Sequence, residues 1–335
     1  MKKISLYLFV TLIAASFGSC KNDTVSVNDP VLTGDYFRWT LEDSITYGTY
    51  DISVVDSNNT FVAGYPCYKI NNGIKTFINF SDSLFFAKIV RSYSKDYAVF
   101  AGARASFPDP TERQIKIYNN GIITSYPAPS SIDYEFGDVL IIEPGKFLVT
   151  GSPSSRFYLF NNGVFNEYFL PDTSGAYKFG MTNNLIYIFA LRGIQGSIYK
   201  FENNQPVFIR NEPMGGAFYN LNSDIIRVFS PDFSQFFYDY FTETSWVRMN
   251  PVDHFYVRAV TGESRNFFMG LSQNSEYNYR LKVWNGTAYT QEETFPSFIN
   301  STSETNPIVS NYKDKTVYFY FNFLGPKLYK GKRIR

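Results

Sequence analysis

Residues that could carry catalytic or metal chemistry are sparse in this chain of 335 residues. His254 is its single histidine, and Cys20 and Cys67 are its two cysteines, so no His and Cys cluster can form an ordinary zinc or copper site. Asp253 precedes His254, but no Gly-x-Ser-x-Gly segment supplies a serine nucleophile for a Ser-His-Asp arrangement. We therefore predict a structural role for His254, no catalytic residue, no metal and no cofactor.

Paired carboxylates are the remaining route to catalysis, because glycosidic bond cleavage needs two acidic groups at a defined separation across a cleft. The acidic candidates fall at expected turns and loops, where solvent-exposed charges are common: Asp109, Glu143, Asp232, Glu263 and Glu276. Glu292 and Glu293 fall in an expected outer strand, where we predict that both face solvent. The expected exposure of these acidic residues favours a protein that is not an enzyme. A glycoside hydrolase or lyase remains the enzymatic alternative.

The composition indicates a β-rich protein without affinity for nucleic acid. Lys and Arg number 31 against 30 Asp and Glu, so no net positive field attracts DNA or RNA. Aromatic residues make up 19% of the chain, which is typical of half-buried strand surfaces and of packing between sheets. Trp39, Trp246 and Trp284 all fall in expected strands next to turns. We predict that these tryptophans pack between strands and do not stack on a ligand.

A short sequence motif recurs along the whole chain: an aromatic-rich strand, an Asn-Asn-Gly or similar turn, and a second strand. It occupies residues 68–73, 116–121, 158–163, 199–204 and 282–286, with weaker copies at 240–244 and 329–331. Asn-Gly suits the type I′ turn of a tight hairpin, because both central residues of that turn need positive φ. Strand-built repeats with a period of roughly 40 to 50 residues are typical of a β-propeller.

The repeat divides the chain into seven units of four antiparallel strands, a to d, with six or eight units as alternatives. We expect the blades at residues 49–78, 84–126, 137–171, 177–210, 216–249, 254–294 and 307–330. The C-terminus ends just after a strand c, whereas residues 36–44 align with strand d and the following turn at 165–173. The N-terminal strand should therefore complete the last blade and leave no free sheet edge. The predicted fold is all-β, a single closed β-propeller over residues 35–335.

The N-terminal residues predict export from the cytoplasm. Lys2 and Lys3 form a positive n-region, and the apolar run of residues 6–15 is too short for a permanent membrane span. Residues 1–19 are therefore predicted to be a cleaved signal peptide. Residues 20–34 are polar and contain turn signals, so we predict that Cys20 is followed by a flexible tether.

Two resemblances refine these expectations. The run from Phe17 to Cys20, Phe-Gly-Ser-Cys, resembles the lipobox of bacterial lipoproteins, although Phe17 replaces the usual aliphatic residue. This resemblance implies that Cys20 is lipidated and anchors the protein to a bacterial membrane outside the cytoplasm, with the outer membrane as the expected one. Cys67 is then a lone thiol, expected to be buried. Over residues 35–335 the repeat resembles kelch-like and two-component-regulator-like propeller repeats, at the level of architecture.

Loop length points to the binding surface. Turns between strands c and d are short and uniform, whereas the b-to-c connections, such as residues 104–113, vary in length. In a propeller they share one face with the d-to-a connections, such as residues 127–136, and variable loops on a rigid scaffold are a common place for recognition. The predicted ligand-binding residues on this face are Arg104, Phe107, Asp109, Arg192, Gln195, Phe233, Tyr277 and Phe323.

These observations favour a lipid-anchored, non-catalytic protein outside the cytoplasm that binds a glycan, a peptide or a protein of the cell envelope. The expected face mixes aromatic and polar side chains, as a sugar or peptide site would. A scaffold subunit of a cell-envelope assembly is the alternative that does not involve a concave site. Contact with the membrane is expected through the N-terminal lipid only.

Overall fold

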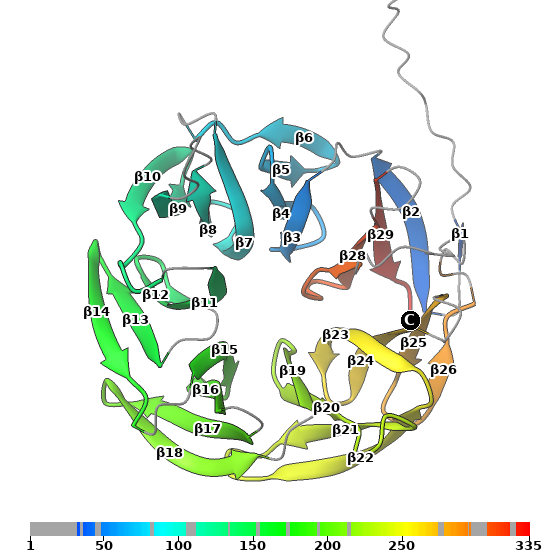
Figure 1. Cartoon of the computed structure of the whole chain (residues 1–335). Coiled ribbons are helices and arrows are strands. Elements are labelled where there is room, and N and C mark those ends of the chain that lie inside the picture. The colour runs from blue at the N-terminus through cyan, green and yellow to red at the C-terminus, as the bar shows by residue number, and fades with distance from the viewer. Residues whose placement is uncertain are drawn as a thin grey trace, which may run out of the picture. The chain divides into compact units, whose positions relative to one another are not determined.

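Antiparallel sheets form a ring of seven blades in the computed structural model of the protein (Figure 1). The structure describes residues 32–33, 36–43, 48–80, 84–104, 112–132, 135–151, 155–171, 175–192, 195–212, 216–273, 278–293, 295, 307–321 and 326–335. These residues belong to one unit, Leu32–Arg335. They contain no helix with the length and apolar character of a membrane span. The predicted closed all-β propeller with seven blades is confirmed.

Blades 1 to 3 each consist of four consecutive strands. Blade 1 contains β3 (Thr49–Val54), β4 (Asn59–Gly64), β5 (Tyr68–Asn71) and β6 (Ile74–Phe77). Blade 2 contains β7 (Phe85–Ser94), β8 (Tyr97–Arg104), β9 (Glu112–Asn119) and β10 (Ile122–Pro127). Blade 3 contains β11 (Phe136–Glu143), β12 (Lys146–Gly151), β13 (Arg156–Asn161) and β14 (Val164–Phe169).

Blades 4 to 6 repeat this arrangement. Blade 4 contains β15 (Gly175–Thr182), β16 (Leu185–Arg192), β17 (Gln195–Glu202) and β18 (Gln205–Glu212). Blade 5 contains β19 (Gly216–Asn220), β20 (Ile225–Phe229), β21 (Phe236–Phe241) and β22 (Trp246–Asp253). Blade 6 contains β23 (Tyr256–Ser264), β24 (Phe267–Gln273), β25 (Tyr279–Trp284) and β26 (Tyr289–Gln291). In each of these blades the first strand lies toward the centre of the ring and the fourth lies at the rim (Figure 1).

Blade 7 closes the ring with strands from both ends of the described chain. It contains β27 (Ile308–Val309), β28 (Thr316–Phe321) and β29 (Lys327–Arg333), and β2 (Phe37–Asp43) pairs with β29 as the fourth strand. The short β1 (Leu32–Thr33) pairs with β2 on its outer side. The predicted closure by the N-terminal strand is therefore confirmed, and the edge of β29 is covered.

The tight c-to-d turns follow the predicted turn chemistry. In three blades φ is positive at both central residues: Asn72 and Gly73, Asn120 and Gly121, Asn162 and Gly163. Blade 4 uses Asn203 and Asn204, whose φ angles of 52° and 57° are also left-handed. Asparagine tolerates this conformation better than other residues with a Cβ atom, so the hairpin forms there without glycine.

The hydrophobic core is divided into clusters that lie between neighbouring blades. In one of them Ile117 of blade 2 belongs to the same cluster as Phe147 and Phe160 of blade 3, whose rings stack with centroids 4.5 Å apart. In another, Trp39 and Phe319 of blade 7, whose rings meet edge-on at 5.6 Å, belong to the same cluster as Phe267 of blade 6. Alternation along each strand therefore buries apolar residues against the adjacent blades, which fixes the ring.

The prediction that Glu292 faces solvent is wrong. Glu292 follows β26 and is 2% exposed, and its Oε2 accepts a hydrogen bond from the backbone N–H of Tyr36 at 3.1 Å. This contact joins blade 6 to the segment that enters β2. Although β26 ends at Gln291, the Glu292 N–H still donates to the Leu281 carbonyl at 2.8 Å, so Glu292 lies beside a fully buried residue of β25.

Candidate functional site

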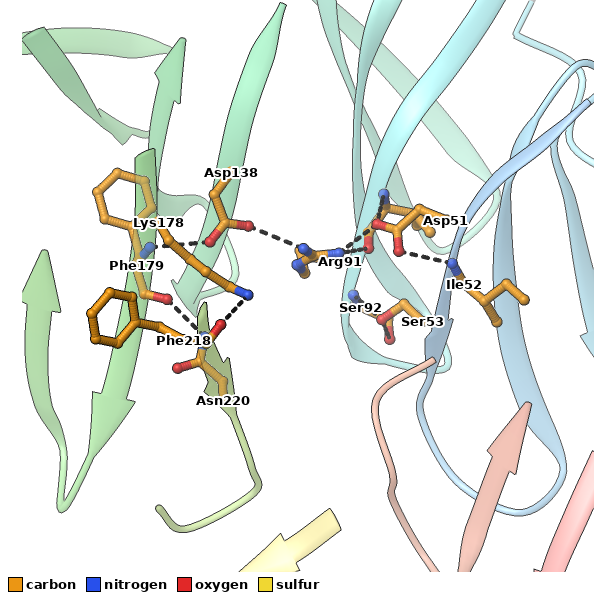
Figure 2. Close-up of polar contacts among 11 residues, drawn as sticks. Asp51, Ile52, Ser53, Arg91, Ser92, Asp138, Lys178, Phe179, Phe218 and Asn220 are labelled. Carbon is orange, nitrogen blue, oxygen red and sulfur yellow. Dashed lines mark hydrogen bonds and ion pairs between the residues drawn. The ribbon is translucent and has the colours of Figure 1, made fainter. Parts of the chain in front are cut away.

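Polar side chains of the inner strands connect neighbouring blades around the centre of the ring (Figure 2). Arg91 on β7 bridges two carboxylates: its Nη1 lies 2.5 Å from Asp51 Oδ2 on β3, and its Nη2 lies 3.0 Å from Asp138 Oδ1 on β11. Asp51 also accepts hydrogen bonds from the backbone N–H groups of Ile52 and Val90, at 2.9 and 3.0 Å. These contacts tie blades 1, 2 and 3 together.

The same row of contacts continues into blades 4 and 5 (Figure 2). Asp138 Oδ2 accepts a hydrogen bond from the Phe179 N–H at 3.1 Å. Lys178 Nζ donates to the carbonyl of Phe218 at 2.5 Å, and the Asn220 side-chain amide donates to the carbonyl of Phe179 at 2.7 Å. We call Asp51, Arg91, Asp138 and Lys178 the inner belt. Its groups bind one another or the backbone, so the belt holds the blades together.

Burial perturbs the charged groups of the inner belt. Burial raises the pKa of the Asp51 carboxyl, and the Arg91 guanidinium opposes this effect. Burial opposes the charged form of Arg91, but the carboxylates of Asp51 and Asp138 outweigh it and raise the pKa of Arg91. Burial lowers the pKa of the Lys178 ammonium, which Asp138 partly restores. A perturbed pKa can mark a functional group, but each of these groups already has a protein partner.

A second charged cluster lies between blades 4 and 5, and its charged groups also pair with one another. Arg227 on β20 donates to both Glu212 on β18 and Asp239 on β21, the latter at 2.6 Å from Nη2. Glu212 and Asp239 are 2% exposed. Burial raises the pKa of the Glu212 carboxyl, and Arg227 opposes that shift. This cluster is an internal connection between two blades and offers no open position for a ligand.

A cavity of about 410 Å³ opens among blades 1, 2 and 3. Its lining residues are Tyr50, Phe86, Lys88, Gly102, Ala103, Arg113, Glu135 and Phe136. They lie at the start of inner strands, at the end of β8 and at the start of β9, so the cavity belongs to the face of the d-to-a and b-to-c connections. We call this face the loop face and the cavity the loop-face cavity. Its volume lies in the range of ligand-binding clefts.

β-Bulges at the start of the inner strands place two of the lining side chains. The register shifts between Thr49 and Asp51 on β3, where Tyr50 is the extra residue, and between Ala87 and Ile89 on β7, where Lys88 is the extra residue. A bulge redirects the side chain of the extra residue and is frequent beside functional sites.

A glycine near the end of strand b allows the bulge on β7 to form. Gly102 on β8 pairs with Ala87 immediately before the bulge, and a Cβ atom at Gly102 would lie 2.0 Å from the Phe86 carbonyl oxygen. Gly64 of blade 1 and Gly151 of blade 3 occupy the corresponding positions, each paired with the residue before a bulge. The repeat therefore builds the same strand end in three consecutive blades.

Charges of both signs surround the loop-face cavity. Lys88 Nζ lies 3.8 Å from Glu135 Oε1 and 4.5 Å from the centroid of the Tyr50 ring. Arg104 and Glu112, at the two ends of the adjacent b-to-c connection, form an ion pair at 3.8 Å. Arg113 also lines the cavity and is half-buried. The lining residues that the structure describes thus combine two cations, one carboxylate and aromatic surface, an arrangement suited to binding.

Some of the predicted ligand-binding residues can be placed. Arg104 ends β8 beside the loop-face cavity, Gln195 begins β17, and Phe233 is 73% exposed between β20 and β21. Arg192 ends β16, and its side chain is outside the description. Arg192 and Gln195 lie opposite each other as the last register pair of β16 and β17 in blade 4, whereas Arg104 belongs to blade 2 and Phe233 to blade 5. Phe107, Asp109, Tyr277 and Phe323 lie outside the described residues, as does Cys20.

The other chemical candidates have ordinary surroundings. His254 is exposed in the connection between β22 and β23. Cys67 is 2% exposed, as expected for a buried thiol, and its Sγ donates to the Gly64 carbonyl at 3.3 Å. Burial raises the pKa of the Cys67 thiol to about 11, so the reactive thiolate is scarce at neutral pH. Among the described residues, no three or more His, Cys, Asp or Glu side chains gather as metal ligands.

Sequence reasoning missed most of the loop-face cavity. Tyr50 and Lys88 are bulge residues, and no local sequence rule separates them from their neighbours in the strand. Arg113 and Glu135 lie within two connections that were assigned to the loop face, at residues 104–113 and 127–136, but they were not singled out. The available signal was the glycine at or near the end of strand b in blades 1 to 3, because a repeated glycine in a strand indicates a bulge or a close backbone approach.

Solved structures share this fold at low sequence identity. YCF48 from Cyanidioschyzon merolae matches with a TM-score of 0.60 and 11% identity, over 87% of this chain and 98% of that one. YCF48 bound to a D1 peptide matches with a TM-score of 0.59 and 9% identity, over 91% and 99% of the two chains. The β-propeller domain of Myceliophteria thermophila Cps50 (Swd1) matches with 0.58 and 9%, over 87% and 99%. No protein-family model matches the sequence, and no curated protein matches it either.

Proposed function

We propose that this protein is a non-catalytic binding protein that holds a peptide segment of a partner protein on its loop face. The observation that carries the proposal is the loop-face cavity, which combines the aromatic surfaces of Tyr50 and Phe86 with the charges of Lys88, Arg113 and Glu135. Side chains on three rigid blades line it, and preorganised surfaces bind at a lower entropic cost. YCF48, a similar propeller, has been solved with a bound D1 peptide, which supports the choice of a peptide ligand.

The proposal includes an anchor outside the cytoplasm. Residues 1–19 act as a signal peptide, and acylation of Cys20 attaches the protein to a bacterial membrane, for which we propose the outer membrane. The propeller then reaches its partner from the membrane surface through the tether. The lipobox-like run that ends at Cys20 supports this part of the proposal.

Hydrolysis of glycosides fits the described geometry less well than binding does. Among the described residues that line the loop-face cavity, Glu135 is the one carboxylate, and it is paired with Lys88. A glycosidase requires a second carboxylate at a fixed distance across the bound sugar. Asp51 and Asp138 do not meet this need, because the inner belt already engages them.

A scaffold role in a cell-envelope assembly is the second candidate. Ile74, Ile122 and Val164 each follow the Asn-Gly turn of their blade and are 69%, 70% and 59% exposed. These aliphatic side chains repeat around the face opposite the loop face, where they can support contact with another protein. Such a protein would need no occupied cavity, so loss of the cavity would leave its binding intact.

The proposed function can be tested by a binding screen with protein that starts at Lys21. Peptide arrays and glycan arrays are probed side by side, and each hit is incubated with the protein to look for cleavage. We expect peptide binding without turnover, weakened by Lys88→Glu in the loop-face cavity and unaffected by Ile122→Ser on the opposite face. Glycan binding alone or ligand cleavage would contradict the proposal. In cells, Cys20→Ser should move the full-length protein from the membrane fraction to the soluble fraction.

A further inference from the structure

Arg113 is the residue of the loop-face cavity whose hydrogen-bond donors are available to a ligand. It lies at the start of β9 and is half-buried, and its guanidinium has no hydrogen bond, ion pair or ring contact with any described residue. The neighbouring cations differ in this respect: Lys88 pairs with Glu135, and Arg104 pairs with Glu112. A guanidinium presents several donors in a rigid plane, so Arg113 keeps donors that a ligand in the cavity can engage.

The chemistry of the missing partner follows from the donor. A carboxylate can accept two parallel hydrogen bonds from a guanidinium, which gives both strength and a defined orientation. The described part of the lining contains two cations and one carboxylate, so an added carboxylate neutralises the positive charge that remains among these residues. Tyr50, Phe86 and Ala103 provide apolar surface beside Arg113. The ligand should therefore carry a carboxylate next to an apolar group.

We propose that the loop-face cavity binds an acidic residue of a partner peptide, with Arg113 pairing its carboxylate and the aromatic wall contacting a neighbouring apolar side chain. This inference rests on the proposed function, because it names the chemistry of the same site. A peptide suits the lining better than an acidic sugar does, since much of the lining is apolar and a sugar ring also needs hydrogen-bonding partners for its hydroxyl groups. The oligosaccharide remains an outcome of the test.

The test compares two peptide libraries that differ at a single position. Both have randomised aliphatic and aromatic residues around a central residue, which is Glu in one library and Gln in the other. Glutamine keeps the shape of glutamate and removes the charge, so the difference in affinity isolates the carboxylate. We expect wild-type protein that starts at Lys21 to bind the Glu library about ten- to a hundredfold more tightly, as is typical of a charged hydrogen-bonded pair.

Variants assign the preference to Arg113. Arg113→Gln should bind both libraries equally, and Arg113→Lys should keep only part of the preference, because lysine retains the charge without the planar pair of donors. Arg156→Gln is the matched control: Arg156 begins the corresponding strand β13 of blade 3 but pairs with Glu167 at 3.2 Å. The control should keep the full preference. Thermal melting of every variant verifies that each one is folded.

The outcomes separate this inference from the proposed function. Equal binding of both libraries by the wild type would overturn the carboxylate inference and leave peptide binding in place. Binding of neither library would overturn both. A preference for Glu that survives in a folded Arg113→Gln protein would place the carboxylate elsewhere on the loop face. Arg113-dependent binding of a uronic-acid oligosaccharide, without peptide binding, would replace the peptide by a sugar.

Discussion

At the scale of single residues, two arginines of blade 2 have different tasks. Arg91 is surrounded by acceptors, because Asp51 and Asp138 lie on either side of it. Arg113 lines a cavity and has no described partner. The same residue type therefore ties blades together in one place and is available to a ligand in another. Its surroundings, and not its identity, separate the two roles.

Replacement of Arg91 by methionine should destabilise the propeller by about 2 to 3 kcal/mol, because two mostly buried carboxylates lose their guanidinium partner. This value is below the usual cost of breaking a buried pair, since the Arg91 side chain is 37% exposed. Urea unfolding of the wild type and the variant measures the difference. Lys146→Met, which breaks a surface pair with Glu143, is the control and should cost under about 1 kcal/mol. Equal effects of the two variants would argue against a stabilising belt.

At the scale of strands, small residues decide where strands bend and where large rings fit. Gly102 permits the bulge that aims Lys88 at the loop-face cavity. Gly331 on β29 pairs with Trp39 on β2, and the indole ring covers its position. A buried aromatic ring thus lies across the seam where the two ends of the chain meet. The closing strand is held by packing as well as by backbone hydrogen bonds.

Gly331→Ala should weaken this seam. The added Cβ atom would lie 2.4 Å from Trp39 Cζ3, and Trp39 cannot move freely because Phe295 and Phe319 pack against it. Overpacking of this kind costs about 1 to 3 kcal/mol, which calorimetry or urea unfolding can measure. Gly151→Ala is the matched strand control, because its Cβ atom would meet no atom closer than 3.5 Å. If both variants unfold at the same urea concentration, the tight fit at Trp39 has no energetic role.

At the scale of the whole molecule, closure brings the two ends of the propeller together. Phe37 pairs with Arg333, and the Ile334 N–H donates to the Tyr36 carbonyl at 2.9 Å. The chain could therefore begin at a different strand and still place every strand next to the same neighbours. Blade 7 needs β2 beside β29, but the covalent connection from β2 to β3 is not required for that contact.

A circular permutant should preserve the fold. It begins at Gly48, ends with residues 36–43, and joins Arg335 to Tyr36 through a short Gly-Ser linker. We expect a urea midpoint close to that of the wild type, because every pairing of blade 7 is retained and a short linker adds little closure entropy. The same chain without residues 36–43 should aggregate, since β29 then exposes a sheet edge. Aggregation of both proteins in light scattering would show that the original connection is essential.

The propeller could be predicted from the amino-acid sequence, because the rules that specify it act over short distances. Asn-Gly pairs such as Asn120-Gly121 specify the tight turns, strand alternation specifies the buried faces, and the repeat period specifies the blades. The missing fourth strand at one end and the extra strand at the other predicted the closure. The lipid anchor at Cys20 stays a prediction from the N-terminal residues.

The residues that share a site could not be identified before the folded structure was known. The loop-face cavity joins Tyr50, Lys88, Arg113 and Glu135, which come from three blades and far-apart places in the chain. Their meeting depends on bulges and on the angle between adjacent blades, and neither is encoded in a local pattern. The burial of Glu292 has the same origin, because its partner Tyr36 belongs to the opposite end of the propeller. Short-range preferences build each blade, whereas ring closure sets the contacts between blades and therefore the candidate site.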